Sequence, residues 1–451
     1  MYVSMSTQTR HSVAEVPLEV WRIIASFLSS EDVKKLYGIN KPLSALAMEQ
    51  RYRSFSIGSL YHDNGQVIRA LQRLAYVHCF NHFVLYEPPS LSVRDQTSLA
   101  EYVRCLTFHP AALAALLPLN RGKYWMKKTL KTLGMLSRHE TAFVVNPKTV
   151  LNIISNLSFV TSLTLDCTHW PGYPTSFRES LPLIAAGWAS FGQNLQWLDL
   201  IVPLDAVHDT ISSVKLPNLR GLSLDFSLWS RATDGSQIFV DFIHDHADTL
   251  RYLGIYTREY LNLFKTLLQD IRIPMLDSFT FNQAHICEQI DIAGLQPFLS
   301  THSGTLKTLY LQFDSYMSHE TWFTIHITLP KLQSLDVGFY PASDYHRRGT
   351  LDYVAQYSCT LVYLDMTSRL CSYNQIDELA TQFSNQGRLR GLRLRVKNLT
   401  PQLLVLLSSK LPFLEYLTLK FDGLLTQEGK PFAYYFFERA EVSFCCHSVM
   451  H

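Results

Sequence analysis

The sequence has little excess charge of either sign and no long apolar run. Lysine and arginine number 40, and aspartate and glutamate number 38, which leaves a formal net charge of +2. This balance gives no electrostatic reason to expect nucleic acid or an anionic membrane as the main partner. The longest uninterrupted apolar run, residues 111–119, contains a proline and is roughly half as long as a membrane-spanning helix requires. We therefore expect no nucleic acid and no membrane among the partners.

A secretion signal and a cysteine framework are also missing. Residues 1–16 lack the apolar central stretch of a secretory signal. The eight cysteines are scattered without CxxC pairs or regular spacing, which favours buried free thiols over disulfides or a metal site. Together these features predict a cytoplasmic or nuclear protein.

Catalytic motifs are absent as well. None of the patterns GxGxxG, GxxxxGK[ST], HExxH and GxSxG occurs in the chain. Asp166, Cys167 and His169 lie close together, but a catalytic use would need a distant partner that the sequence does not identify, so we interpret them as loop residues. We expect a protein that is not an enzyme, with no catalytic residue and no cofactor.

The segment DFIHDHAD, residues 241–248, is the most suggestive group of metal-ligating side chains. Asp241 and His244 share one face of a predicted helix, so a metal ion could in principle be held there. The opposite face of the same helix is apolar, and a solvated helix face within a repeat explains these residues better. We therefore predict no metal site.

Apolar residues, in contrast, are plentiful. They make up 47% of the chain and charged residues only 17%, which excludes wholesale disorder and provides material for a continuous core. A chain of 451 residues is long enough for two or three compact domains or for one long repeat array.

Residues 16–53 show the pattern of three short helices. Pro17 suits the start of the first helix, and apolar residues then recur at helical spacing. Ser29 or Ser30 can cap the second helix, and Pro42 suits the start of the third. A helix trio of this size buries too little apolar surface to be stable alone, so a partner is expected to cover its apolar face.

This stretch resembles the F-box family without a gap. The apolar–Pro pair, the glutamate and the aliphatic residues that open the family pattern are matched by Val16, Pro17, Glu19, Val20, Ile23, Ile24 and Leu28. The acidic–aliphatic pair of the second helix and the later apolar positions are matched by Asp32, Val33, Leu36 and Ile39. The Arg-Trp pair common in the family's third helix is replaced here by Pro42 and Leu43.

The resemblance implies docking on a Skp-family adaptor, which links an F-box protein to a cullin. The residues expected to make this contact are Val16, Pro17, Val20, Ile24, Leu28, Val33, Leu36 and Ile39. The alternative interpretation is a helical cap of the following domain that binds nothing.

One phrase, L-x-x-L-x-L with substitutions, occurs ten times between residues 160 and 419. The first copy begins at Val160 and the last at Leu414, so the mean period is about 28 residues, within the leucine-rich-repeat range. Each copy predicts a short parallel strand followed by a helix or an irregular return segment. Between 195 and 361 two kinds of unit alternate, one entered through an aliphatic–Pro step and one through an amphipathic helix, so the module is a double repeat of roughly 56 residues.

These patterns divide the chain into five parts and predict an α/β fold. We expect a flexible terminus at 1–13, an F-box at 14–58, a cap with degenerate repeats at 59–156, a curved leucine-rich-repeat-like solenoid at 157–425, and a C-terminal cap or tail at 426–451 that could cover the last strand edge. In the third part, strands are predicted at 80–85 and 103–108 and helices at 124–136 and 147–157. The repeats lack the consensus asparagine after the last leucine and are similar to the degenerate repeats of fungal F-box proteins.

The strand ladder predicts a binding surface. If the leucines point into the core, the residues between and after them lie together on the concave face. These are Trp197, Asp199, Asp225, Tyr252, Tyr256, Asn282, Tyr310, Gln312, Asp336, Tyr363, Asp365, Arg393, Arg395, Tyr416 and Lys420. Tyrosine and tryptophan are frequent binding anchors, although β propensity alone also enriches tyrosine in strands.

The hypothesis from the sequence is a substrate adaptor of a Skp–cullin–F-box ubiquitin ligase. Its partners would be a Skp-family protein, a cullin reached through it, and an unidentified protein substrate on the concave face. The alternative is a leucine-rich-repeat interaction scaffold without a ligase.

Overall fold

The computed structural model describes most of the predicted elements. The described residues are 16–57, 99–109, 147–167, 175–202, 210–212, 214–225, 236–257, 268–283, 294–313, 327–339, 344–385, 387–425 and 440–445. The terminus at 1–13, the strand expected at 80–85 and the helix expected at 124–136 lie outside them.

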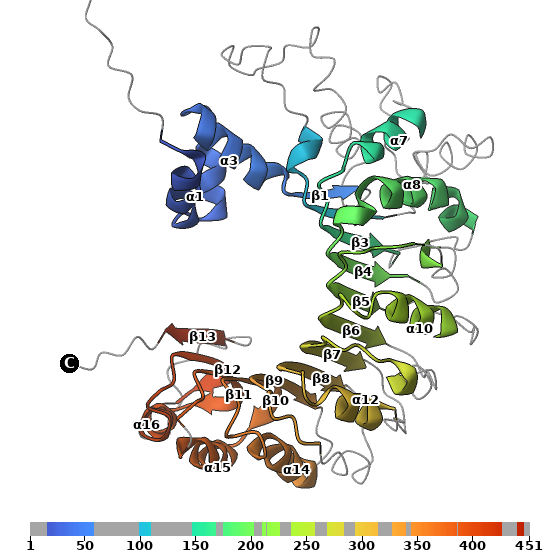
Figure 1. Ribbon diagram of the computed structural model, residues 1–451. Helices are drawn as coiled ribbons and strands as arrows, with labels where there is room; N and C mark the ends of the chain where they lie inside the picture. The colour runs from blue at the N-terminus through green and yellow to red at the C-terminus, as the bar shows by residue number, and fades with distance from the viewer. Residues whose placement is uncertain are drawn as a thin grey trace, which may run out of the picture.

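One continuous sheet forms the frame of the molecule, and it bends into an open arc (Figure 1). Its strands lie side by side in chain order: β1 (Ser54–Ile57), β2 (Cys105–Phe108), β3 (Ser162–Asp166), β4 (Trp197–Ile201), β5 (Gly221–Asp225), β6 (Tyr252–Thr257), β7 (Ser278–Gln283), β8 (Thr308–Phe313), β9 (Ser334–Phe339), β10 (Tyr363–Cys371), β11 (Gly391–Leu399), β12 (Tyr416–Leu424) and β13 (Ala440–Cys445). Because each new strand adds beside the previous one, the fold is an α/β solenoid.

Strand pairing is parallel from β1 to β12 and antiparallel only between β12 and β13. The register is in phase except for one shift between Met366 and Leu370 of β10, so that Leu198 pairs with Leu222 and Leu222 with Leu253 in successive strands. The expectation that the C-terminal segment covers the last strand edge is confirmed for residues 440–445, which pair along β12.

Helices return the chain between strands on the outer side of the arc (Figure 1). Those of the solenoid are α7 (Pro147–Ser155), α8 (Thr175–Phe191), α10 (Ser236–Asp245), α12 (Leu295–His302), α14 (Asp344–Ala355), α15 (Tyr373–Ser384) and α16 (Pro401–Lys410), with 3-10 turns η1 (Leu99–Tyr102) and η2 (Gly192–Asn194). The predicted alternation of the two kinds of repeat unit is confirmed. Helices α10, α12 and α14 each precede a strand of the kind that was expected to follow a helix, namely β6, β8 and β10.

The repeated leucines form the core. In β8, for instance, Leu309, Leu311 and Phe313 are each at most 1% exposed, whereas the residues between them are partly exposed. The aliphatic–Pro steps are tight turns. The aliphatic residue of each step is buried, and its carbonyl accepts the N–H of the first repeat leucine, as in the 3.0 Å bond from Leu219 to Leu216. The proline faces solvent, where its missing N–H costs no hydrogen bond.

Three helices precede the solenoid, as the sequence predicted: α1 (Leu18–Ser26), α2 (Ser30–Lys35) and α3 (Lys41–Tyr52). Ser29 caps α2, and Asn40 caps α3 by accepting the N–H of Leu43 at 2.8 Å. Their own core is small and contains Val33, Leu43 and Leu46.

The third helix joins this small core to the solenoid. Near its C-terminus, Met48 and Tyr52 pack against the main core, and the chain then continues directly into β1. The sheet therefore begins at Ser54, inside the segment 14–58 that was assigned to the F-box. This first strand was missed because SFSI contains no leucine.

Replacement of Leu309 by alanine tests the buried ladder. The side chain is fully buried at the middle of the sheet, so its truncation is expected to lower the free energy of unfolding by about 2–5 kcal/mol. Val405→Ala on α16 is the control, because Val405 is 66% exposed and its truncation is expected to change stability by less than about 0.5 kcal/mol. Urea denaturation measures both; equal midpoints for the two variants would contradict the assigned core.

Candidate functional site

The concave face of the sheet presents three rows of side chains between the buried leucines. The in-phase register puts Trp197, Gly221 and Tyr252 in a first row, Asp199, Ser223 and Gly254 in a second, and Ile201, Asp225 and Tyr256 in a third. Neighbouring strands are about 4.8 Å apart, so residues in one row can touch. The first two rows continue through β12, whereas the third is interrupted in β10, where the register shifts between Met366 and Leu370.

All fifteen residues predicted for this face occupy row positions. Trp197 and Tyr416 are exposed, and most of the others are half-buried. Asp365 differs, because it is only 3% exposed. Its carboxylate accepts bonds from the backbone N–H and the hydroxyl of Thr367 and pairs with Arg393 at 2.7 Å. Asp365 is thus a fixed structural carboxylate rather than an open contact residue.

An aromatic platform lies at the N-terminal half of this face. The ring of Trp197 lies 4.6 Å from that of Tyr252, across the intervening strand β5. It passes over Gly221, where an added Cβ would come within 2.1 Å of the indole ring. Tyr252 in turn leans over Gly254, and its hydroxyl lies 3.3 Å from that of Tyr256. Glycine at these two row positions allows the rings to lie flat. The repeated leucines give no sign of this arrangement, but large residues alternating with glycine in register could have indicated it.

Polar side chains link the middle strands. Asn282 donates to Gln312 at 3.3 Å, and the hydroxyl of Tyr310 also bonds to Gln312. The Oδ1 atom of Asn282 is buried and has no hydrogen-bond partner among the described residues.

Two carboxyls of the second row are held in environments that disfavour their charge. Burial raises the pKa of Asp199, and the neighbouring charges of Asp225 and Asp166 raise it further, against a hydrogen bond from Ser223. Burial also raises the pKa of Asp336 to about 7, with repulsion from Asp365, although Arg393 and Lys420 oppose the shift. A cation beside Asp199 or Asp336 would stabilise the charged form of its carboxyl group.

The C-terminal end of the face is basic but already paired. Arg393 contacts Asp365, and Arg395 lies 3.4 Å from Asp422. The charge predicted for this end is therefore largely balanced within the chain.

A second candidate site is an apolar patch on the three N-terminal helices. No residue of α1 is buried. Phe27 is 84% exposed and Ile23 60%, and the exposed group continues with Val16, Val20, Ile24, Leu28 and Ile39. We call these seven residues the apolar patch.

The predicted docking residues divide between this patch and the small core. Val16, Pro17, Val20, Ile24, Leu28 and Ile39 are exposed. Val33 is buried in the small core and Leu36 is half-buried against it, so these two support the helices from inside. Ile23 of α1 and Phe27, which directly follows this helix, are the most exposed apolar residues here and were not among the predicted docking residues, although their helical spacing with Val20 and Ile24 indicates the same face.

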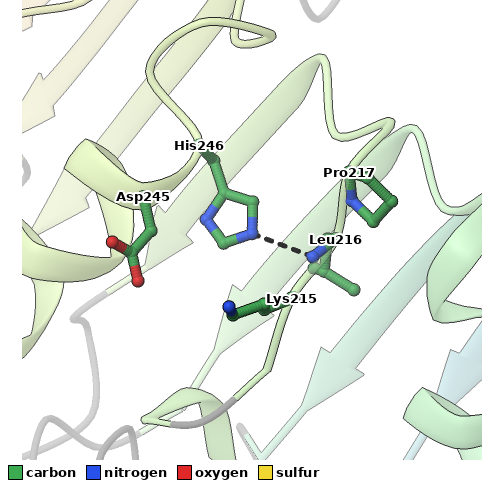
Figure 2. A pocket seen from close by; sticks show the side chains of 5 residues that line it. All are labelled: Lys215, Leu216, Pro217, Asp245 and His246. Carbon is green, nitrogen blue, oxygen red and sulfur yellow. Dashed lines mark hydrogen bonds between the residues drawn. The ribbon is translucent and has the colours of Figure 1, made fainter.

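The segment 241–248 serves the fold in a way that the sequence did not reveal. His246 is 5% exposed, and its Nε2 accepts the backbone N–H of Leu216 at 2.9 Å (Figure 2). Its Nδ1 lies 2.7 Å from the carbonyl of Phe242, to which it donates. With both ring nitrogens used, this histidine joins the end of α10 to the aliphatic–Pro turn of the preceding unit.

We call this arrangement, in which one histidine bonds to a helix and to a turn, a histidine clamp. The same clamp recurs one double repeat later. His302 accepts the N–H of Ile273 at 3.0 Å and donates to the carbonyl of Phe298 at 2.7 Å. In the next double repeat, Tyr357 occupies this place and donates its hydroxyl to the carbonyl of Ile327 at 2.7 Å. All three residues stand four positions before a repeat leucine and four after an aromatic residue, a pattern that could have been found in the sequence.

A small pocket of about 290 Å³ lies beside this first clamp and is lined by Lys215, Leu216, Pro217, Asp245 and His246 (Figure 2). His246 is not available as a ligand because its ring nitrogens are occupied. Within the described part of the chain, no group of three or more histidine, cysteine, aspartate or glutamate side chains could hold a metal ion. Four described cysteines are free, but only Cys167 and Cys371 are buried, and Cys359 is exposed, against the expectation of buried thiols.

Comparison with models of known protein families and with the sequences of curated proteins gives no match for this chain. Among the described residues, no helix combines the length and the apolar character that crossing a membrane would require.

The histidine clamps predict a pH-dependent stability. Burial lowers the pKa of His246 and of His302 below the ordinary value, because it disfavours the charged imidazolium. The charge of Arg272 lowers the pKa of His302 further, and the hydrogen bonds to the carbonyls of Phe242 and Phe298 oppose the two shifts. Above about pH 6.5 both histidines are neutral in the folded and unfolded chain, and their contribution is complete. As the pH falls below this value, the unfolded chain binds protons first, so stability falls.

Thermal unfolding between pH 7.5 and 5 measures this loss. The double variant His246→Gln/His302→Gln is expected to be less stable at pH 7.5 and to show a shallower decrease toward pH 5. His244→Gln is the control, because His244 is exposed. An unchanged pH slope in the double variant would show that other groups cause the dependence.

Proposed function

We propose that this protein is a substrate adaptor of a Skp–cullin–F-box ubiquitin ligase. The observation that carries the proposal is α1, an apolar helix with no buried residue. A surface of this kind is costly in water and is typical of a protein interface. Its residues match the F-box pattern in order and spacing, so the partner that the resemblance implies is a Skp-family protein.

The packing of the helices supports this role. The small core under the patch is complete without α1's outer face, since Leu18, Trp21 and Ala25 already pack on it. Ile23, Ile24 and Phe27 are therefore free to contact another protein without loss of the fold. A helical cap that binds nothing would be expected to carry polar residues at these positions.

The solenoid supplies the second half of the proposal. Its concave face combines aromatic, acidic and basic side chains, a composition suited to binding a protein segment. The three helices project from one end of the arc, on the side toward which the concave face opens (Figure 1). A substrate on this face would be held at a fixed position relative to the ligase, and ubiquitin transfer would follow from proximity rather than from chemistry in this chain.

The alternative is an interaction scaffold of the same fold without a ligase. The concave face fits both functions equally, and only the apolar patch favours the adaptor.

Binding to a Skp-family protein tests the proposal. The variant Ile24→Glu/Phe27→Glu places two charges in the proposed interface and is expected to reduce recovery of a co-expressed Skp-family protein at least about ten-fold. Because both side chains are exposed, the melting temperature should not change.

The matched control is Met275→Glu/Val405→Glu, two exposed apolar residues of the solenoid at 47% and 66% exposure. It should bind the Skp-family protein like the natural sequence. Normal binding by the Ile24/Phe27 variant would mean that the patch is not the docking surface, and no binding by the natural sequence would refute the adaptor proposal.

A further inference from the structure

The first row of the concave face has the same arrangement of residues at both of its ends. From β4 to β12 the residues in register are Trp197, Gly221, Tyr252, Ser278, Thr308, Ser334, Tyr363, Gly391 and Tyr416. Each end therefore has an aromatic residue on either side of a glycine, and a run of hydroxyl side chains separates the two ends. No residue of this row from Trp197 to Tyr416 carries a charge.

The C-terminal end of the row is built like the aromatic platform at the N-terminal end. The ring of Tyr363 covers Gly391, where an added Cβ would lie 2.5 Å from Cδ2 of the tyrosine. Arg393 donates a hydrogen bond to the hydroxyl of Tyr363, which holds the ring in place. Tyr416 follows in register and is 55% exposed. We call Tyr363 and Tyr416 the second platform.

The hydroxyl side chains between the platforms are available to a ligand. Ser278, Thr308 and Ser334 are half-buried, and within the described part of the chain their hydroxyls make no hydrogen bond. Their oxygens are not among the buried unpartnered atoms of this part, so solvent reaches them. Since a hydroxyl can donate to a carbonyl, the floor between the platforms offers donors to a peptide backbone.

We propose that this row binds a proline-rich segment of the protein substrate in the polyproline II conformation. Prolines of the segment pack on the two platforms, and its backbone carbonyls accept hydrogen bonds from the hydroxyls between them. The identification of the segment as part of a substrate rests on the proposed adaptor function; the recognition chemistry does not.

A polyproline II segment fits the chemistry of this row. Such a segment has no internal hydrogen bonds, so its carbonyls are open to hydroxyl donors. Aromatic-lined grooves are a recurring way of binding proline-rich segments. An extended strand could not pair on this face, because the backbone N–H and C=O groups of the sheet point to neighbouring strands. The absence of charge in the row favours an uncharged segment over an acidic or basic one.

The spacing of the two platforms sets the length of the segment. Gly221 lies on β5 and Gly391 on β11, six strand spacings apart. At about 4.8 Å per strand, this separation is about 29 Å along the sheet. A polyproline II helix rises about 3.1 Å per residue, so about nine residues connect the centres of the two platforms.

Fluorescence anisotropy on the full-length chain tests the inference with labelled dodecaproline, which spans about 37 Å. Dodecaproline is expected to bind at least about ten-fold more tightly than tetraproline, which spans about 12 Å and reaches one platform only. Because no charge takes part, its affinity should change little with salt. A glycine–serine peptide of the same length is expected not to bind.

Three outcomes of these titrations would overturn the proposal. They are equal affinity of dodecaproline and tetraproline, equal affinity of dodecaproline and the glycine–serine peptide, and binding of a chitin hexasaccharide in place of dodecaproline. The last outcome would assign the two platforms to a sugar.

Variants at both ends of the row separate recognition from folding. Trp197→Ala and Tyr416→Ala each remove one platform and are each expected to weaken dodecaproline binding at least about ten-fold. The melting temperature of Tyr416→Ala should not change, because this side chain is exposed. Ser278→Ala/Ser334→Ala is expected to weaken binding several-fold. Tyr373→Ala is the matched control, because Tyr373 is 47% exposed at the start of α15 on the outer side of the arc (Figure 1). Dodecaproline binding by Tyr416→Ala at the natural affinity would contradict the two-platform site.

The same preparations are probed with the Skp-family protein. Skp binding without dodecaproline binding would refute this inference alone, and dodecaproline binding without Skp binding would refute only the adaptor function.

Discussion

The in-phase burial of leucines along a parallel sheet is the constraint on which the rest of this structure depends. Each strand from β2 to β12 contributes at least two buried apolar side chains, and the pairing of Leu198 with Leu222, and of Leu222 with Leu253, continues along the arc. A shift of one residue in any strand would turn its leucines toward solvent. The same register therefore fixes the rows on the opposite face, and the binding surface is a by-product of how the core is built.

This dependence explains why much of the solenoid could be predicted from the sequence. The ten copies of one phrase gave the strands β3–β12, their order and the residues that point outward. The repeated phrase could not predict which side chains of different repeat units contact one another. The stacking of Trp197 on Tyr252 depends on Gly221, and the burial of Asp365 depends on Thr367 and Arg393. Strand β1 was missed for the related reason that its serines and phenylalanine carry no repeat signal.

The N-terminal helices were predictable to a different degree. Caps and spacing gave all three, but the sequence could not tell which apolar residues support the trio and which remain outside. Val33 packs inside, whereas Ile23 and Phe27 are exposed, although all three are large and apolar. The distinction follows from how α1 rests on α3, a tertiary arrangement that helical periodicity alone does not determine.

The histidine clamp has a consequence for how such an array can change in evolution. His246 ties α10 to the turn at Leu216, and His302 ties α12 to the turn at Ile273, so each bond lies wholly within one helix-and-turn pair. Duplication or deletion of a complete pair would leave every clamp with its own partner and every leucine in phase. Loss of a single unit would separate a histidine from the backbone group it serves. Selection acting on such duplications would thus favour arcs that lengthen in whole pairs, with the N-terminal helices and the antiparallel strand β13 unchanged at the two ends.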